Sequence, residues 1–249
     1  MITLAISKLE SFLETKIEGF FNKQFSGTLE PIEIIKALER EVEKKARKIS
    51  GEVVAPNRYE IFLGVDDYQR LCAKRVRDTF YTAVAKQAIR KSCFIDGDLR
   101  IVLRKDAEAL SDTFVLTSAF SDGSESAPPK SEPDTLVLSR QKFDVPLNLP
   151  TEYKTVSLSV NKGADVGAYL EFGEKQVYIG RREKSDFILT DESVSRLHAY
   201  ITFDRYRHTL HDAGSKNGTF VNGEQIESCL LEAGDEIRVG TTIIVYDVI

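Results

Sequence analysis

Residues 193–223 read SVSRLHAYITFDRYRHTLHDAGSKNGTFVNG, and this stretch decides the fold of the second half of the chain. A short run of β-forming residues, His198 to Phe203, lies between a serine-containing segment and a block rich in Gly, Asn and Asp. Gly, Asn and Asp are the residues that tight turns require. The pattern is therefore typical of a short strand bounded by two loops.

Similar short runs flank this stretch on both sides. They cover residues 168–172, 176–179, 186–189, 236–239 and 241–248, and turn-forming residues separate them. Strands this short and this numerous predict an all-β sandwich over residues 167–249.

The charge of this half is uneven. Residues 167–249 contain 9 Lys and Arg against 14 Asp and Glu, whereas residues 1–120 contain 20 against 18. Neither balance is the strongly basic one of a nucleic-acid binder. Four of the nine basic residues nevertheless fall between residues 181 and 196, and a local cationic cluster on an acidic domain indicates an anionic ligand.

Four sequence blocks occupy the predicted loops. They are Gly180-Arg181, residues 193–198, residues 212–219 and residues 221–223. A phosphate ester carries about −1.5 to −2 charges and three acceptor oxygens, so its receptor needs a guanidinium group, a hydroxyl and free backbone N–H groups. Arg181 and Ser195 supply the first two of these groups from separate loops.

In this order the blocks resemble the signature of forkhead-associated (FHA) domains, which are non-catalytic phosphothreonine-binding β-sandwiches. The resemblance implies that Arg181 and Ser195 contact the phosphate and that Arg196 adds charge or holds the ligand backbone. It implies that Asn217 hydrogen-bonds the peptide main chain beside the phosphothreonine. Lys216 replaces the Thr or Ser of many relatives, so it either reaches the phosphate as a flexible charge or is solvated.

Other residues of the motif are assigned structural roles. Gly180, Gly218 and Gly223 are expected to satisfy the backbone demands of turns, and Asn222 to close a hairpin loop. The resemblance implies that His198 is a buried brace for the binding loops.

Further basic residues and histidines are expected to take no part in chemistry. Arg182 and Lys184 are expected to be solvated surface residues. His208 and His211 are three residues apart on a predicted strand, so they point to opposite faces and are not expected to bind a metal.

The first 120 residues have a different pattern. Apolar residues recur at helical spacing in residues 2–25, in a helix from Pro31 to Gly51 and in a helix over 66–91. Residues 57–64 and 113–120 are predicted to be strands, and Asp96-Gly97 is predicted to close a hairpin. The order predicts a compact α+β domain over residues 1–120.

Residues 121–166 are predicted to be a flexible linker, because their first part is rich in Ser, Pro and acidic residues. Thr135 in this segment is the strongest candidate for phosphorylation by a Ser/Thr kinase, since acidic residues precede it and Leu138 lies three positions after it. A phosphorylated Thr135 could occupy the FHA site of the same chain. An unmodified tether is an equally open alternative.

Residues 54–68, which read VAPNRYEIFLGVDDY, resemble the N-terminal domain of FhaA-type proteins of actinobacteria. The layout of α+β domain, linker and C-terminal FHA domain is similar too. The resemblance implies a cytoplasmic adaptor in Ser/Thr-kinase signalling that is linked to cell-wall synthesis or division. It implies phosphothreonine-containing partners, such as a kinase or its membrane-associated substrate, which could recruit the protein to the inner face of the membrane.

Several other classes of protein are disfavoured. The sequence has no phosphate-binding loop, no His-Glu-x-x-His and no nucleophile elbow, so no enzyme and no cofactor are expected. No run is long and apolar enough to predict a transmembrane segment.

The alternative function is a nucleic-acid-binding N-terminal domain tethered to an FHA module, because the order of helices and strands in this domain resembles that of K-homology modules. Residues 1–120 lack the Gly-x-x-Gly loop of those modules, however. The three cysteines, Cys72, Cys93 and Cys229, form no pair that predicts a disulfide or a zinc site.

Overall fold

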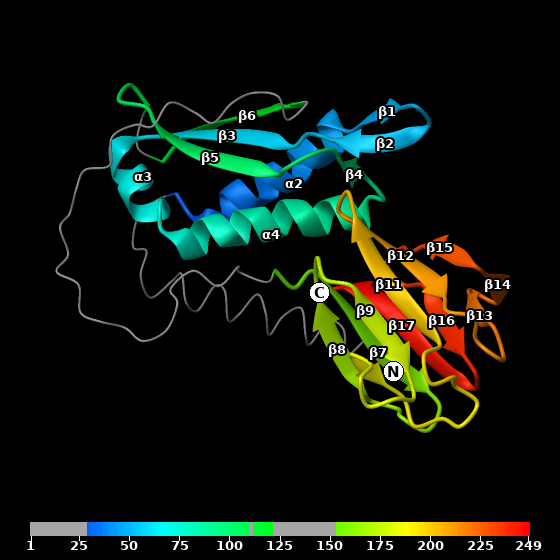
Figure 1. Cartoon of the computed structure of the whole chain (residues 1–249). Coiled ribbons are helices and arrows are strands. Elements are labelled where there is room, and N and C mark those ends of the chain that lie inside the picture. Colours follow the sequence, from blue (N-terminus) through cyan, green and yellow to red (C-terminus); the bar gives the residue numbers. More distant parts are fainter. Residues whose placement is uncertain (1–28, 110–111, 122–152) are drawn as a thin grey trace, which may run out of the picture.

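A computed structural model describes residues 29–109, 112–121 and 153–249, which form an α+β domain followed by a β-sandwich (Figure 1). The predicted fold class is confirmed. The predicted helix over residues 2–25, most of the predicted linker and Thr135 lie outside the described residues.

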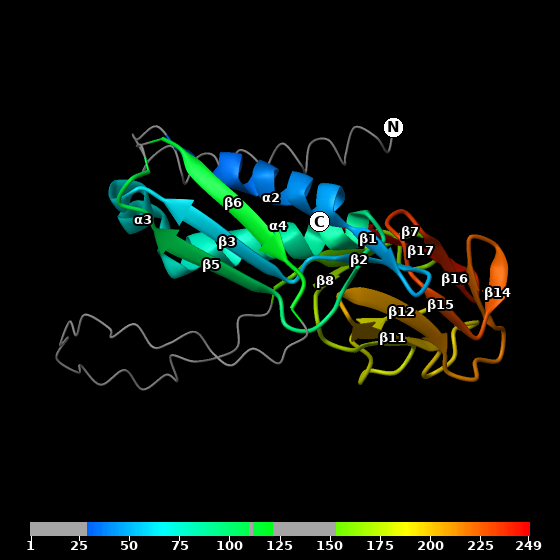
Figure 2. The ribbon, with the colours of Figure 1, turned by 90° about the horizontal axis from the view of Figure 1, so that it is seen from above.

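The N-terminal domain places two helices against one face of a small sheet (Figures 1 and 2). One three-stranded sheet has the order β5-β3-β6, and a second has the order β1-β2-β4. The elements are α2 (Pro31–Lys45), β1 (Arg47–Ile49), β2 (Glu52–Ala55), β3 (Arg58–Leu63), α3 (Val65–Leu71), α4 (Lys74–Arg90), β4 (Phe94–Ile95), β5 (Arg100–Lys105) and β6 (Phe114–Ala119). In β3 the buried residues Tyr59, Ile61 and Leu63 alternate with partly exposed ones, as the sequence predicts for a half-buried strand.

Helix α2 begins where the sequence predicts, at Pro31, because proline suits the first helical position and Glu33 closes a capping box with Glu30. Its predicted end at Gly51 is wrong, since the helix stops at Lys45. Residues 47–55 instead form the β1–β2 hairpin, whose turn residues Ser50 and Gly51 have φ of 52° and 96°. The positive φ at Gly51 explains why a glycine stands there.

The predicted helix over 66–91 is also divided. The helix is interrupted at Cys72 and Ala73, and Ala73 has the extended backbone angles φ −56° and ψ 139°. The break lets α3 cover the end of β5 while α4 packs along α2. The break contains no Gly or Pro, so the sequence carries no signal for it.

The predicted hairpin at Asp96-Gly97 is wrong. Gly97 has the expected positive φ of 73°, but the strands on either side of it do not pair with each other. Strand β4 pairs in parallel with β2, and β5 pairs in parallel with β3. The turn is therefore a corner that carries the chain from one sheet to the other.

The C-terminal domain is a sandwich of two sheets with a shared apolar core. Its strands are β7 (Val156–Lys162), β8 (Tyr169–Phe172), β9 (Val177–Gly180), β10 (Phe187–Ile188), β11 (Ala199–Asp204), β12 (Arg207–Asp212), β13 (Thr219–Val221), β14 (Glu224–Ile226), β15 (Ser228–Leu230), β16 (Glu236–Val239) and β17 (Thr242–Val248). One sheet has the order β10-β9-β11-β12-β15, and the other has the order β14-β13-β16-β17-β7-β8.

Strand β7 corrects the predicted end of the linker. Residues 156–162 pair with β17 along their length and contribute the buried side chains of Val156, Leu158 and Val160 to the sandwich core. The sandwich therefore begins before residue 167, because this segment is a paired strand whose apolar residues are buried in the core. None of the helices in residues 29–109 is long and apolar enough to cross a membrane.

Candidate functional site

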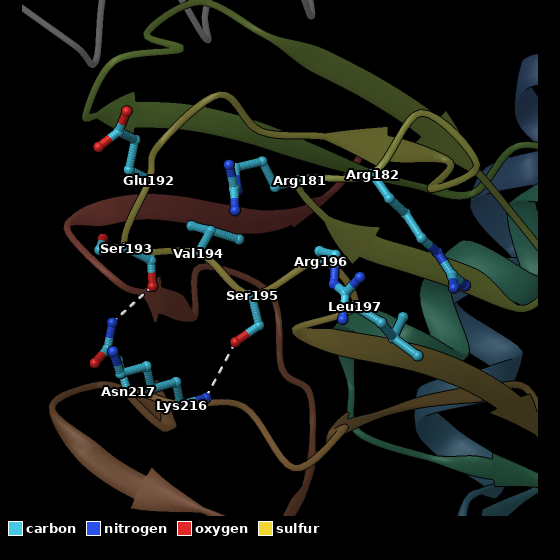
Figure 3. A pocket seen from close by; sticks show the side chains of 10 residues that line it. All are labelled: Arg181, Arg182, Glu192, Ser193, Val194, Ser195, Arg196, Leu197, Lys216 and Asn217. Carbon is cyan, nitrogen blue, oxygen red and sulfur yellow. Dashed lines mark hydrogen bonds between the residues drawn. The ribbon is translucent and has the colours of Figure 1, made fainter.

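A surface pocket lies where several loops of the sandwich meet (Figure 3). It is lined by Arg181, Arg182, Glu192, Ser193, Val194, Ser195, Arg196, Leu197, Lys216 and Asn217. The five residues that the sequence predicts for phosphopeptide binding are all among them. The pocket therefore joins residues that are up to 36 positions apart in the sequence, from Arg181 to Asn217.

The loop after β9 is tied to the serine-containing loop through the backbone. The amide of Arg181 donates to the carbonyl of Ser195 at 3.1 Å, and the amide of Arg182 donates to that of Arg196 at 3.2 Å. Gly180 permits this approach, because a Cβ atom there would lie 2.5 Å from the carbonyl oxygen of Arg196. Gly180 thus serves close packing at the end of a strand, whereas the sequence predicts that it serves a turn.

The buried ring of His198 forms hydrogen bonds to the backbone of Ser195 and of Gly218. The Nδ1 atom of His198 accepts the amide hydrogen of Ser195 at 3.0 Å, so its Nε2 atom carries the proton and donates to the carbonyl of Gly218 at 3.2 Å. The ring is fully buried, and this burial lowers the pKa of His198. A neutral imidazole thus connects two of the loops that line the pocket.

The loop over residues 213–218 is connected to the serines by two further hydrogen bonds. The hydroxyl of Ser195 accepts the amide hydrogen of Lys216 at 3.0 Å, and the side-chain amide of Asn217 donates to the carbonyl of Ser193 at 2.7 Å (Figure 3). Asp212 shapes the start of this loop by accepting the amide hydrogens of Gly214 and Ser215.

Asp191 is a supporting residue that the sequence reasoning missed. One carboxylate oxygen accepts from the amide and the hydroxyl of Ser193, and the other accepts from Thr241 and Thr242 at the start of β17. Burial alone would raise the pKa of Asp191, but these hydrogen bonds outweigh it and hold the pKa well below its usual range. The Asp-x-Ser spacing of Asp191 and Ser193, typical of a side-chain-capped turn, is the signal that could have found it.

The pocket is cationic. Four basic side chains line it against the one carboxylate of Glu192, and none of the four forms an ion pair within the described residues. In Figure 3 the side chain of Arg182 extends away from Arg181, Ser195 and Asn217. Guanidinium groups and a hydroxyl together suit an anion with several acceptor oxygens. No group of three or more metal-binding side chains occurs in the described parts of the chain.

Sequence comparison gives the family. Residues 6–114 match the family model described as FhaA, N-terminal domain, and residues 177–240 match the FHA domain model. The chain is also 36% identical over 99 residues to the oxoglutarate dehydrogenase inhibitor of Corynebacterium efficiens, which is 40% of this chain and 68% of that protein. The chain belongs to the FHA-domain proteins. Its architecture is an FhaA N-terminal domain followed by an FHA domain, as the sequence predicts.

A further relative and a solved structure are similar to the FHA half of this protein. The chain is 35% identical over 89 residues to the glycogen accumulation regulator GarA of Mycobacterium tuberculosis H37Rv, which is 36% of this chain and 55% of GarA. A solved structure of the FhaA FHA domain complexed with the intracellular domain of Rv3910 is 35% identical, covers 36% of this chain and 98% of that chain, and has a TM-score of 0.34.

The FHA fold explains how the remaining motif residues are used. Asn222 and Gly223 occupy the two loop positions of the β13–β14 hairpin with φ of 51° and 90°. Gly218 has a φ of 75° beside the ring of His198. His208 is buried, and its ring bonds Tyr246 and Gly173 inside the FHA core rather than facing His211, which bonds Thr202.

Proposed function

We propose that the FHA domain holds a phosphothreonine of a partner protein in the pocket of Figure 3, with Arg181 and Ser195 on the phosphate. Arg196 and Lys216 add positive charge, and Asn217 holds the main chain of the bound peptide. The observation that carries the proposal is the convergence of these five residues, from three separate loops, on one cationic pocket without ion-pair partners among the described residues.

At the level of the cell, we propose a non-catalytic adaptor in Ser/Thr-kinase signalling. The FHA domain supports this role, and the regulator and inhibitor functions named for two relatives agree with it. The finer proposal of a link to cell-wall synthesis or division rests on the resemblance of the whole layout to FhaA-type proteins. The partner would be a phosphorylated kinase or a phosphorylated, membrane-associated substrate of one.

The proposal is tested by isothermal titration calorimetry of the full chain with an oriented peptide library in paired Thr and phosphothreonine forms. We expect binding of the phosphorylated form only, and Arg181→Ala should weaken it by about tenfold or more, because a hydrogen bond to a charged group contributes about 1.5–3 kcal/mol. Lys184→Ala is the matched control, since Lys184 is exposed and does not line the pocket. Equal affinity for both forms of the peptide, or equal losses in the two variants, would refute the assignment.

A further inference from the structure

The turn between β11 and β12 has an unusual composition. Asp204 pairs with Arg207, so the turn has two loop residues, Arg205 and Tyr206, and their φ angles are 49° and 63°. Two-residue turns of this kind favour Asn-Gly, because both positions need positive φ. Bulky residues in this conformation cost free energy. Such strain persists only where contacts of the side chains with the surrounding structure compensate for it.

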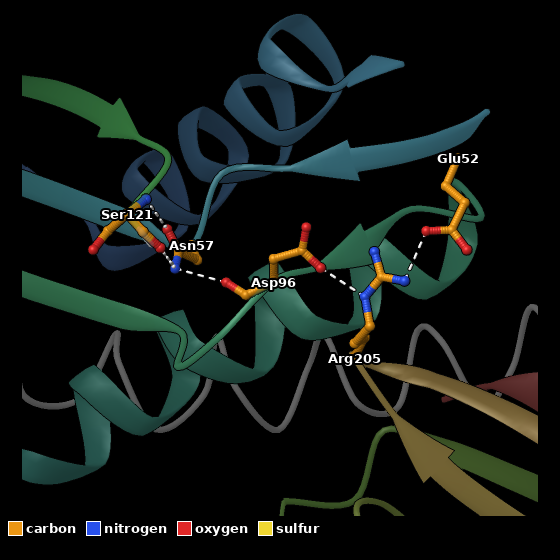
Figure 4. Close-up of polar contacts among 5 residues, drawn as sticks. All are labelled: Glu52, Asn57, Asp96, Ser121 and Arg205. Carbon is orange, nitrogen blue, oxygen red and sulfur yellow. Dashed lines mark hydrogen bonds and ion pairs between the residues drawn. The ribbon is translucent and has the colours of Figure 1, made fainter. Parts of the chain in front are cut away.

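The surroundings of Arg205 belong to the N-terminal domain (Figure 4). Its guanidinium donates to Asp96 at 2.6 Å and to Glu52 at 2.7 Å, and it lies 4.5 Å from the centre of the Phe94 ring. An arginine that is shared between two carboxylates and an aromatic face is held in one geometry, unlike an isolated surface ion pair.

The backbone makes a second link at the same place. The amide of Ile95 donates to the carbonyl of Arg205 at 3.1 Å. Strand β4 is at the edge of the β1-β2-β4 sheet, and an open edge presents unpaired backbone groups. The turn of the FHA domain therefore caps one of these groups.

Each domain also packs a side chain against the core of the other domain. Tyr206 packs against the core of the N-terminal domain, and its hydroxyl lies 2.6 Å from that of Tyr81 on α4. In the opposite direction, Ile89 of α4 is only 1% exposed and packs in the core of the FHA domain. Tyr81 also donates to Glu174 of the FHA domain at 2.9 Å.

The acceptor surface is itself held rigidly. The side-chain amide of Asn57 donates to the carbonyls of Asp96 and Ser121, at 2.7 Å and 2.9 Å, and its oxygen accepts the amide hydrogen of Ser121 (Figure 4). Asn57 is 4% exposed. Asp96 is thus held through its backbone from within its own domain, as well as through its carboxylate by Arg205.

The phosphate pocket lies at the opposite end of the same hairpin. Ala199 pairs with Asp212 at the pocket end of β11 and β12, and Asp204 pairs with Arg207 at the end that contacts the N-terminal domain. A strand of six residues spans roughly 20 Å at ~3.3 Å per residue. Contact between the domains therefore leaves the pocket open.

From these contacts we infer that Glu52, Phe94, Asp96 and the open edge of β4 form a docking surface whose occupant is the Arg205-Tyr206 turn of the same chain. The two domains then form one body that presents the phosphate pocket outward. A phosphorylated partner bound there is held in a defined orientation to the N-terminal domain, rather than on an independent module.

The experiment measures hydrogen exchange of the Ile95 amide by NMR in the full chain, because that amide bonds directly across the interface. The main variant combines Arg205→Asn with Tyr206→Gly. Asn-Gly is the pair that this turn prefers, so the hairpin should fold at least as well while losing both anchors. We expect exchange at Ile95 to become about tenfold faster or more, with the amides of Ile201 and Leu210 as protected as in the wild type.

A charge-swap series checks the ion pair. Arg205→Asp should accelerate exchange at Ile95, and adding Asp96→Arg should restore much of the protection. The matched control is Lys162→Asp, which makes the same change of charge on an exposed residue of β7 and should leave the Ile95 amide unchanged.

Binding to the pocket separates this inference from the proposed function. Phosphopeptide affinity in the Asn-Gly variant should stay within about twofold of the wild type, since the pocket is at the other end of the hairpin. The docking inference is overturned if the Ile95 amide exchanges as fast in the wild type as in the Asn-Gly variant while Ile201 and Leu210 stay protected. It is equally overturned if the Lys162→Asp control accelerates exchange as much as Arg205→Asp.

Discussion

The Nδ1 atom of His198 lies 3.0 Å from the amide nitrogen of Ser195 and accepts its hydrogen. This bond orients the backbone of a residue that lines the pocket, while the other ring nitrogen holds the carbonyl of Gly218. One buried ring thus links the core of the FHA domain to two of the loops that line the pocket, so a change at His198 should affect stability and binding together.

We expect His198→Ala to lower the melting temperature by several degrees and to weaken phosphopeptide binding. Loss of the ring leaves the part-buried N–H of Ser195 and the buried carbonyl of Gly218 without these partners, at a cost of about 1–3 kcal/mol. Asn217→Ala is the comparison, because Asn217 is exposed and should affect binding with little change in melting temperature. A His198→Ala variant that melts like the wild type and loses only binding would show that His198 is a ligand contact.

Asp191→Asn should loosen the serine loop from the start of β17. The substitution places an amide NH₂ where a carboxylate accepts hydrogen bonds from Ser193, Thr241 and Thr242, and bonds to a charged group contribute about 1.5–3 kcal/mol. We expect lower stability by about 2 kcal/mol or more in urea unfolding and weaker peptide binding. The exposed Glu183→Gln removes the same charge as a control, and a similar loss there would contradict the bracing role.

Stability should fall on acidification before the carboxylates titrate. Burial lowers the pKa of His208 from 6.5 to about 4; the hydrogen bond to Gly173 opposes this shift, and the charge of Arg207 adds to it more weakly. The unfolded chain therefore takes up a proton below about pH 6.5 that the folded protein does not accept until about pH 4. Stability should rise with pH across this window, by up to about 3 kcal/mol.

Urea unfolding at several pH values from 4 to 7 measures this dependence. Burial lowers the pKa of His198 as well, so His198 should add to the same slope. The pKa values of the carboxyls of Asp191 and Asp212 are also lowered, so these two groups change the stability only at more acidic pH. His208→Gln should flatten the slope between pH 4 and 6.5. An unchanged slope in this variant would show that another group carries the proton uptake.

Phosphorylation of Thr135 stays a prediction from the sequence, since this residue lies outside the described parts of the chain. If a phosphorylated Thr135 competes for the pocket, kinase treatment should weaken binding of an added phosphopeptide, and Thr135→Ala should abolish that effect. Mass spectrometry establishes the modification, and calorimetry before and after treatment measures the competition. Equal affinities before and after stoichiometric phosphorylation would exclude it.

Much of the fold could be predicted from local patterns. The β3 strand shows strict alternation, and α2 has a proline start and a regular apolar face. Both patterns are set by residues close in sequence. The parallel pairing of β4 with β2 and of β5 with β3 could not be predicted, because Asp96-Gly97 has the composition of a hairpin turn but connects strands of two sheets.

The residues that line the pocket could be predicted from the sequence, whereas the Arg205-Tyr206 turn could not. Arg181, Ser195 and Asn217 stand in a recognisable order of loop motifs. The Arg205-Tyr206 turn gives no such signal, because it lacks the Gly or Asn that usually marks a two-residue hairpin. Its conformation depends on contacts with residues 52 and 94–96, more than 100 positions away, which no local pattern encodes.

Chemical-shift mapping tests the central claim most directly, namely that the FHA pocket receives a phosphothreonine. The measurement titrates the ¹⁵N-labelled full chain with a phosphothreonine peptide and with its unphosphorylated twin. The account predicts that the largest shifts fall on the amides of residues 181–182, 193–197 and 216–217, and that the unphosphorylated peptide produces none there. Shifts centred on another surface, or the same shifts with both peptides, would contradict it.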